Sequence, residues 1–159
     1  MREWVYTSNP TELVGTPPAN GWHFTWEGYA RSIIINNIIL PNSTGWLLRA
    51  VMYQYIDPNG VVFPNGNMCY DNSPIFKEEA KTIICAGYPF SYSNLAFDVD
   101  LDSLSYSWAE PLDNYLTNYN PFAPNSDPVD WDPSYSANAP IPGNPVLDPT
   151  NGEISFFSN

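Results

Sequence analysis

The sequence predicts an all-β protein built from β-sandwich modules, and three observations favour this fold class. Short segments alternate between apolar and polar residues, as strands do when they bury one face. Several of these segments are rich in β-branched and aromatic residues, which pack well on a pleated sheet. The 17 prolines and 9 glycines interrupt the chain too often for long helices. Strands at roughly regular spacing with turns between them are typical of sandwiches.

The first part of the chain contains four expected strands, at residues 22–26, 32–39, 46–53 and 61–63. Trp22, Phe24 and Trp26 share one face of the first strand. The run at 32–39 is β-branched and predicts a buried strand. Turn residues at 57–60 precede the last strand. We expect the tryptophans of alternating strands to be core residues, at positions 22, 26, 46 and 108.

The second part of the chain contains further expected strands, at residues 75–84, 88–92, 103–108 and 152–157. Between residues 111 and 149 the chain is rich in Pro, Asn, Asp, Ser and Tyr, which predicts short strands at most. A boundary near residue 68 is expected to divide two domains. The first, 1–68, is an N-terminal β-sandwich-like region, and the second, 69–159, is a β-sandwich module.

The charge of the chain restricts its partners. Its formal net charge is -12, from 17 acidic and 5 basic residues. Phosphate backbones and anionic membrane surfaces repel such a chain, so nucleic acid is excluded as a partner. The longest apolar run, at 33–40, is too short to cross a bilayer, and we expect no membrane insertion. The N-terminus lacks a signal peptide, so we expect a fragment whose export signals lie outside this chain.

Cys69 and Cys85 are the two cysteines of the chain. The polar stretch 77–81 lies midway between them, and a chain reversal there would bring the two sulfur atoms together. The resulting disulfide would stabilise the fold by about 3 kcal/mol. It would also indicate an oxidising compartment. The alternative is two independent buried thiols.

Asp98, Asp100 and Asp102 form the sharpest candidate for a metal site. Residues two apart share a face of an extended chain, so three carboxylates would crowd together there. Bending, water or a cation must relieve their repulsion. Calcium takes roughly six to eight oxygen ligands, and Asp71 is a further candidate ligand if its segment packs nearby. The alternative is a solvated acidic loop that precedes a strand.

The sequence predicts a protein without catalytic activity. His23 is the only histidine, and the alternation places it on the polar face of its strand. The chain has neither a Gly-x-Ser-x-Gly elbow nor a phosphate-binding glycine loop. Glu27 and Glu110 are one carboxylate pair of the kind that glycosidases use, but nothing in the sequence singles them out.

Trp131 and Tyr135 are candidates for ligand binding. Both lie in a loop rich in Pro and Asp, where we expect exposed rings. A flat exposed ring can stack on the apolar face of a sugar. These two residues therefore predict a saccharide-binding surface.

Several short motifs in the second half of the chain occur in the order that is usual in one family of bacterial repeats. They are Ser73-Pro74-Ile75-Phe76, Cys85-Ala86-Gly87-Tyr88-Pro89-Phe90, the segment from Asp98 to Tyr106, and Leu147-Asp148-Pro149-Thr150-Asn151-Gly152. In these motifs the chain resembles the immunoglobulin-like and cadherin-like repeats of giant Bacteroidetes surface proteins. That family includes gliding-motility adhesins exported by the type IX secretion system. The chain departs from the pattern at Leu101, where glycine is common, and at Tyr29-Ala30-Arg31, where paired cysteines often precede the arginine.

The resemblance implies tandem immunoglobulin-like or cadherin-like β-sandwich modules, the second incomplete at its C-terminus. It implies a non-catalytic structural or adhesive module at the cell surface or outside the cell. Its expected partners are neighbouring modules of the same polypeptide, surface glycans and other cell-surface proteins. Cadherin-like modules use an Asp-x-Asp segment at a domain edge, which supports calcium (Ca2+) as a cofactor. The alternative is a carbohydrate-binding module attached to an extracellular enzyme.

Overall fold

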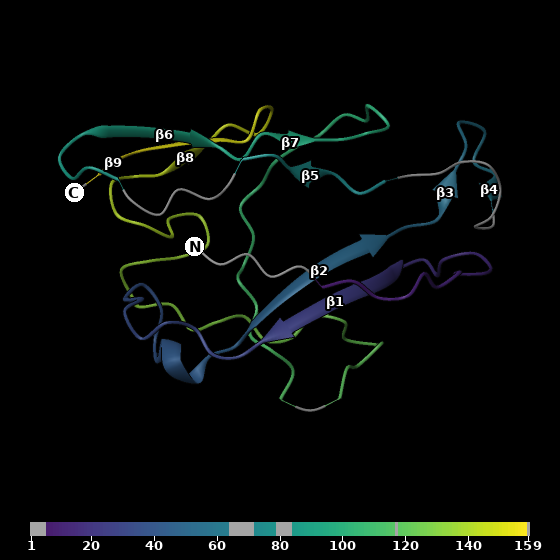
Figure 1. Ribbon diagram of the computed structural model, residues 1–159, viewed down its shortest axis with the longest axis horizontal. Helices are drawn as coiled ribbons and strands as arrows, with labels where there is room; N and C mark the ends of the chain where they lie inside the picture. Colours follow the sequence, from purple (N-terminus) through teal and green to yellow (C-terminus); the bar gives the residue numbers. More distant parts are fainter. Residues whose placement is uncertain (1–5, 64–71, 79–83, 117, 159) are drawn as a thin grey trace. The chain divides into compact units, whose positions relative to one another are not determined.

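The computed structural model describes residues 6–63, 72–78, 84–116 and 118–158 (Figure 1). Within these residues the regular structure consists of short strands and one single-turn 3-10 helix, η1 (Pro41–Ser43). The strands are β1 (Trp22–Gly28), β2 (Trp46–Met52), β3 (Tyr55–Ile56), β4 (Val62–Phe63), β5 (Ile75–Phe76), β6 (Pro89–Ser93), β7 (Ala96–Phe97), β8 (Val146–Leu147) and β9 (Glu153–Phe157). The predicted all-β class is therefore confirmed.

The strands form four small sheets. β1 pairs with β2, β3 with β4 and β5 with β7, while the three-stranded sheet has the order β6-β9-β8. The strands are antiparallel in the pairs β3–β4, β5–β7, β6–β9 and β8–β9. A two-layer sandwich stays a prediction.

Contacts divide the chain into two compact units. One unit combines Met1–His23 with Val51–Tyr70, and the other combines Phe24–Ala50 with Asp71–Asn159. The predicted boundary near residue 68 stays a prediction, because residues 64–71 lie outside the described part of the chain. No helix in the described ranges is long and apolar enough to cross a membrane.

The hairpin β3–β4 of the first unit forms around the predicted turn at 57–60. The carboxylate of Asp57 accepts the backbone N–H groups of Asn59, at 2.9 Å, and of Val61, at 2.8 Å. Gly60 adopts φ +83°, in the left-handed region that glycine enters without steric cost. The bonds from Val61, from the Asn59 side chain and from the turn amides lower the pKa of Asp57, because they stabilise its charged form. An aspartate followed by Pro-Asn-Gly thus determines this turn.

The hairpin β8–β9 of the second unit forms around another predicted turn. Oδ1 of Asp148 accepts the backbone N–H of Thr150, at 2.8 Å, and its hydroxyl, at 2.6 Å. The N–H of Gly152, whose φ is +72°, donates to the carbonyl of Asp148 at 2.9 Å. The predicted strands at 88–92 and 152–157 are confirmed as β6 and β9, and those at 22–26, 46–53 and 61–63 as β1, β2 and β4.

The predicted buried strand at 32–39 is wrong. The N–H of Ile35 donates to the carbonyl of Ser32 in a turn, and Ile34 is 84% exposed. Ile38 alone joins another strand-like segment, in an isolated bridge with Trp131. β-Branched residues favour an extended backbone only where a partner completes the hydrogen-bond ladder, and the Asn36-Asn37 pair interrupts this run.

Two more predicted strands differ from the structure. Residues 103–108 form no strand, although the N–H of Tyr106 donates to the carbonyl of Pro149 at 2.9 Å. The expected strand at 75–84 is reduced to the two residues of β5, while residues 79–83 lie outside the described part. The pattern of residue types indicated extended backbone but did not determine where a ladder partner lies.

The buried hydrophobic residues are few. Among the described residues they are Ile38, Leu47 and Val129, and no large side chain is fully buried. The expectation that the tryptophans form a core is wrong for Trp26, which is 39% exposed; those at 22, 46 and 108 are half-buried. Trp26 and Trp46 instead contact each other edge to face, with ring centroids 4.4 Å apart. Sheets of two or three strands offer too little area to enclose such large rings.

Candidate functional site

The three-stranded sheet β6-β9-β8 of the second unit separates side chains onto two faces. Successive residues of a strand point to opposite faces, so the register places Phe90 opposite Phe156 on one of them. Their ring centroids lie 5.3 Å apart. The alternation also assigns Tyr92, Leu147 and Ile154 to this face, and all five residues are half-buried. This face is apolar.

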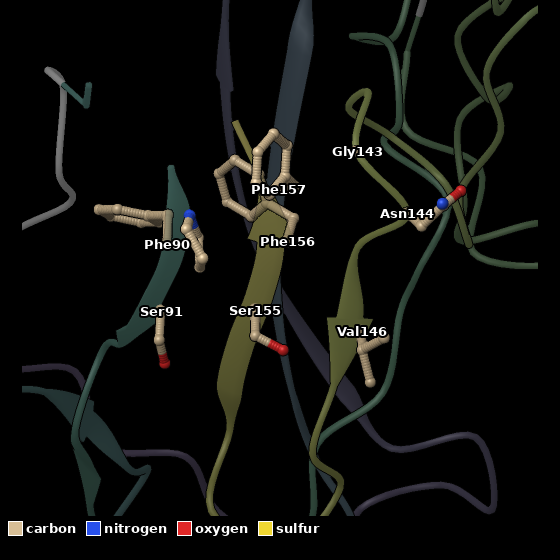
Figure 2. A pocket seen from close by; sticks show the side chains of 9 residues that line it. Phe90, Ser91, Gly143, Asn144, Val146, Ser155, Phe156 and Phe157 are labelled. Atoms are coloured by element: carbon tan, nitrogen blue, oxygen red, sulfur yellow. The ribbon is translucent and has the colours of Figure 1, made fainter. Parts of the chain in front are cut away.

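The opposite face, here called the serine face, comprises Pro89, Ser91 and Ser93 of β6, Val146 of β8, and Glu153, Ser155 and Phe157 of β9. Ser91 pairs with Ser155, and Val146 pairs with the same residue from the other side. Figure 2 shows this row across the three strands. A pocket of about 390 Å³ lies here, lined by residues of all three strands and by the loop that precedes β8.

Gly143 and Asn144 form the wall of this pocket on the side of β8 (Figure 2). The carbonyl of Gly143 accepts the N–H of Phe157 at 3.1 Å, which ties the loop to β9. A Cβ atom on Gly143 would lie 1.8 Å from the carbonyl oxygen of Phe157, so only glycine permits this approach. Asn144 follows with φ +54°, a left-handed conformation that asparagine tolerates better than most residues.

A second pocket, of about 240 Å³, adjoins the first because Gly143 and Asn144 line both. Ser134 and Tyr135 form part of its wall. The predicted ligand-binding residue Tyr135 is half-buried here rather than fully exposed. Its N–H donates to the carbonyl of Asp132 at 2.9 Å, which fixes the turn that presents the ring.

The structure separates Trp131 from Tyr135. Trp131 lines neither of these two pockets. It is half-buried, it pairs with Ile38 in the isolated bridge, and its indole Nε1 donates to the carboxylate of Glu110 at 2.9 Å. The expected exposed ring is therefore a packed residue, because the main chain around it bonds to the segment at 37–39.

A third pocket, of about 390 Å³, has Arg31 in an otherwise apolar wall that includes Trp46 and Leu112. The guanidinium donates through Nε to the carbonyl of Gly45, at 2.8 Å, and through Nη2 to that of Leu112, at 3.1 Å. Burial lowers the pKa of Arg31, and the nearby carboxylate of Asp113 acts in the opposite direction. Arg31 thus connects three segments that are distant in the sequence.

The predicted metal ligands do not share a face of an extended strand, because the chain turns at Asp98. Asp98 is 5% exposed, and its Oδ1 accepts the N–H of Asp100, at 2.8 Å, and that of Asp102, at 3.4 Å. Leu101 takes φ +66°, a left-handed conformation that residues other than glycine adopt uncommonly. An aspartate that accepts its own chain's amides forms such a turn without a cation.

The carboxylate of Asp100 has a hydrogen-bond partner outside this turn. Its carboxylate accepts the N–H of Asn72 at 2.6 Å and the side-chain amide of the same residue at 3.0 Å. These bonds lower the pKa of Asp100. Within the described residues, no group of three or more His, Cys, Asp and Glu side chains is placed to hold a metal ion. Asp71 lies outside those residues, and calcium binding stays a prediction.

The side chain of Cys85 is exposed, which contradicts the alternative of two buried thiols. Cys69 lies outside the described residues, so its pairing with Cys85 stays a prediction.

The residues considered for catalysis have separate partners. Nε2 of His23 lies 2.9 Å from the carbonyl oxygen of Asn20. Glu27 accepts the N–H of Tyr115 at 3.1 Å, and Glu110 accepts the indole N–H of Trp131. The absence of catalysis stays a prediction.

Comparison of the chain with protein-family models, with curated proteins and with solved structures gives no match. The resemblance to surface-protein repeats therefore remains a prediction from motifs. The geometry of the described residues is what supports a function.

Proposed function

We propose that the chain is a non-catalytic structural or adhesive module of a secreted or cell-surface bacterial protein. One observation carries the proposal: among the residues that the structure describes, many large apolar side chains are exposed while few hydrophobic residues are buried. Ile34, Leu101 and Phe122 are 84%, 81% and 97% exposed. A contiguous exposed apolar patch is typical of a site that a partner covers, and we propose that these side chains belong to such a patch. Burying one such side chain contributes roughly 1.5–3 kcal/mol, and several of them together offset part of the entropic cost of association.

The finer fold proposed here is a tandem of immunoglobulin-like or cadherin-like modules. The sheet β6-β9-β8 supports it, because one face is apolar and half-buried and the other carries serines. That division is typical of one sheet of a sandwich. The Pro89-Phe90 motif lies in β6, and the motif at 147–152 forms the β8–β9 turn, as the repeat pattern would require.

The partners proposed for this module are neighbouring modules of the same polypeptide, other cell-surface proteins and surface glycans. The net charge of -12 argues against anionic membranes and nucleic acids. The exposed apolar residues favour surfaces that are themselves partly apolar.

Adhesion is testable with beads coated with the 159-residue chain and passed over intact cells of the source organism. We expect retention above that of uncoated beads. A variant that places aspartate at three highly exposed apolar positions, I34D/L101D/F122D, should lose most of it. The control variant N42D/S105D/N138D adds the same charge at exposed polar positions and should behave as the parent chain.

Equal retention of both variants would contradict adhesion through the exposed apolar residues. Location is tested with an antibody raised against the chain. Intact cells should be labelled, and labelling that requires permeabilised cells would contradict a surface location.

A further inference from the structure

We propose that the two adjoining pockets at Gly143 and Asn144 together bind a neutral oligosaccharide. This inference rests on the adhesive function proposed above and names a ligand class and a site for it. The site is formed within the second unit by the serine face, the loop before β8 and the turn at Tyr135.

The linings of the two pockets contain no charged side chain. No Asp, Glu, Lys, Arg or His lines either of them, although the chain has 17 acidic residues. A charged ligand group placed there would be desolvated without an opposite charge to compensate it. The acidic chain as a whole also repels anions. A neutral ligand is therefore favoured over phosphorylated, sulfated or carboxylated ones.

The chemistry of the lining fits a polyhydroxylated ring. Phe157, which is 48% exposed, and Val146 supply apolar surface against which the C–H face of a pyranose can pack. Ser91, Ser155 and Asn144 supply groups that both donate and accept hydrogen bonds, as sugar hydroxyls require. Small-molecule sites combine apolar walls with a few polar groups in this way.

The second pocket repeats the same combination. Tyr135 supplies an aromatic ring with a hydroxyl, and Ser134 supplies another hydroxyl. Because Gly143 and Asn144 belong to both linings, a ligand that passes over them reaches both rings. Two adjoining pockets of about 390 Å³ and 240 Å³, each with an aromatic wall, suit consecutive units of one saccharide chain better than a single compact ligand.

Backbone and side-chain hydrogen bonds hold the walls in place before a ligand arrives. The carbonyl of Gly143 is bonded to β9, and the side-chain amide of Asn37 donates to the carbonyl of Pro140 at 2.6 Å. Ser136 and Ala139 exchange backbone hydrogen bonds beside the Tyr135 turn. Walls that are already ordered reduce the entropic cost of binding.

The test uses the whole chain and an array of neutral oligosaccharides, namely hexamers of cellulose, xylan, laminarin, mannan and chitin, beside sialylated and sulfated glycans. We expect at least one neutral hexamer to bind, with affinity then measured by calorimetry. N144G keeps the left-handed backbone and removes the amide, and should weaken binding about tenfold. S91D places a carboxylate on the serine face and should weaken it at least as much.

S103D, an exposed serine outside both pockets, is the matched control and should bind as the parent chain does. Melting temperatures of all three variants show whether each is folded. Binding restricted to acidic glycans, no binding of any neutral hexamer, or equal affinity of N144G, S91D and S103D would overturn the inference. Beads that still adhere to cells in that case would leave the proposed function standing and indicate a protein partner.

Discussion

Replacement of Arg31 by methionine should destabilise the second unit markedly. The methionine keeps most of the apolar stem and removes the guanidinium, which bonds to the carbonyls of Gly45 and Leu112 at 2.8 Å and 3.1 Å. A hydrogen bond from a charged donor contributes roughly 1.5–3 kcal/mol. Arg31 is half-buried, so water replaces part of each bond in the variant. We therefore expect a loss of about 2–3 kcal/mol for the pair.

Lysine at the same position separates charge from geometry. The ammonium group of a lysine keeps the attraction to Asp113, but it does not reproduce the planar guanidinium, which reaches two carbonyls at once. The R31K variant should therefore lose about half of the free energy that R31M loses, roughly 1–1.5 kcal/mol.

Urea unfolding followed by tryptophan fluorescence measures both variants, since Trp46 lines the same pocket as Arg31. The control is R49M, which removes an exposed arginine and should change the unfolding free energy by less than about 0.5 kcal/mol. Equal stability of R31M and R49M would refute the role assigned to Arg31 as a connector of three segments.

Three further predictions concern the turns and the acidic cluster. Gly143→Ala should lower the free energy of unfolding in urea by more than about 2 kcal/mol, because the added Cβ would overlap a carbonyl of β9. In the control Gly87→Ala the added Cβ meets open space, so only the strain of φ +81° remains and the loss should be about 1 kcal/mol. The side-chain and backbone hydrogen bonds from Thr150 lower the pKa of Asp148. The stability that Asp148 contributes is therefore complete above the pKa of an unfolded aspartate and is lost as pH falls through the lower pKa of the folded state. In Thr150→Ala, carbon-detected NMR titration should show the pKa of Asp148 rising towards its ordinary value. If residues 98–102 bind calcium, adding it should release or absorb heat in calorimetry and raise the melting temperature of the chain. The absence of both effects would contradict calcium binding.

Local signals in the sequence predicted the hairpins well. The Asp-Pro-Asn-Gly turn at 57–60 and the Asp-Pro-Thr-Asn-Gly turn at 148–152 both form as expected, because the aspartate side chain bonds to amides within the same few residues. β3, β4 and β8 pair only with the strand across their own turn, whereas β9 also pairs with the distant strand β6. The existence of the two hairpins therefore follows from residues that are close in the chain, and the full length of β9 does not.

Signals that depend on distant partners failed. The run at 32–39 has strong β propensity, yet its strand-like pairing is limited to one isolated bridge, in which the N–H of Ile39 and the carbonyl of Asn37 bond to the segment around Trp131. Asp98 was expected to repel its neighbours along a strand, but its carboxylate accepts two amides of the following turn. Propensity and charge spacing do not reveal which hydrogen bonds close.

The candidate site was predicted in part. Tyr135 was singled out as an aromatic residue in a polar loop, and it does line a pocket. Trp131 was singled out for the same reason, but it bonds to Glu110. Asn144 and Phe157 were missed because they meet only when the loop before β8 bonds to β9. The adjacent Gly143, in a Pro-Gly-Asn sequence, was the available signal for a tight backbone approach.

The most direct test of an adhesive function is competition during attachment of intact source cells to a surface they colonise. Soluble chain added in increasing amounts should reduce attachment in a dose-dependent way, and N42D/S105D/N138D should do the same. The I34D/L101D/F122D variant should reduce it far less, since its apolar contacts are replaced by charge. Attachment that stays constant at saturating amounts of the parent chain would contradict the account.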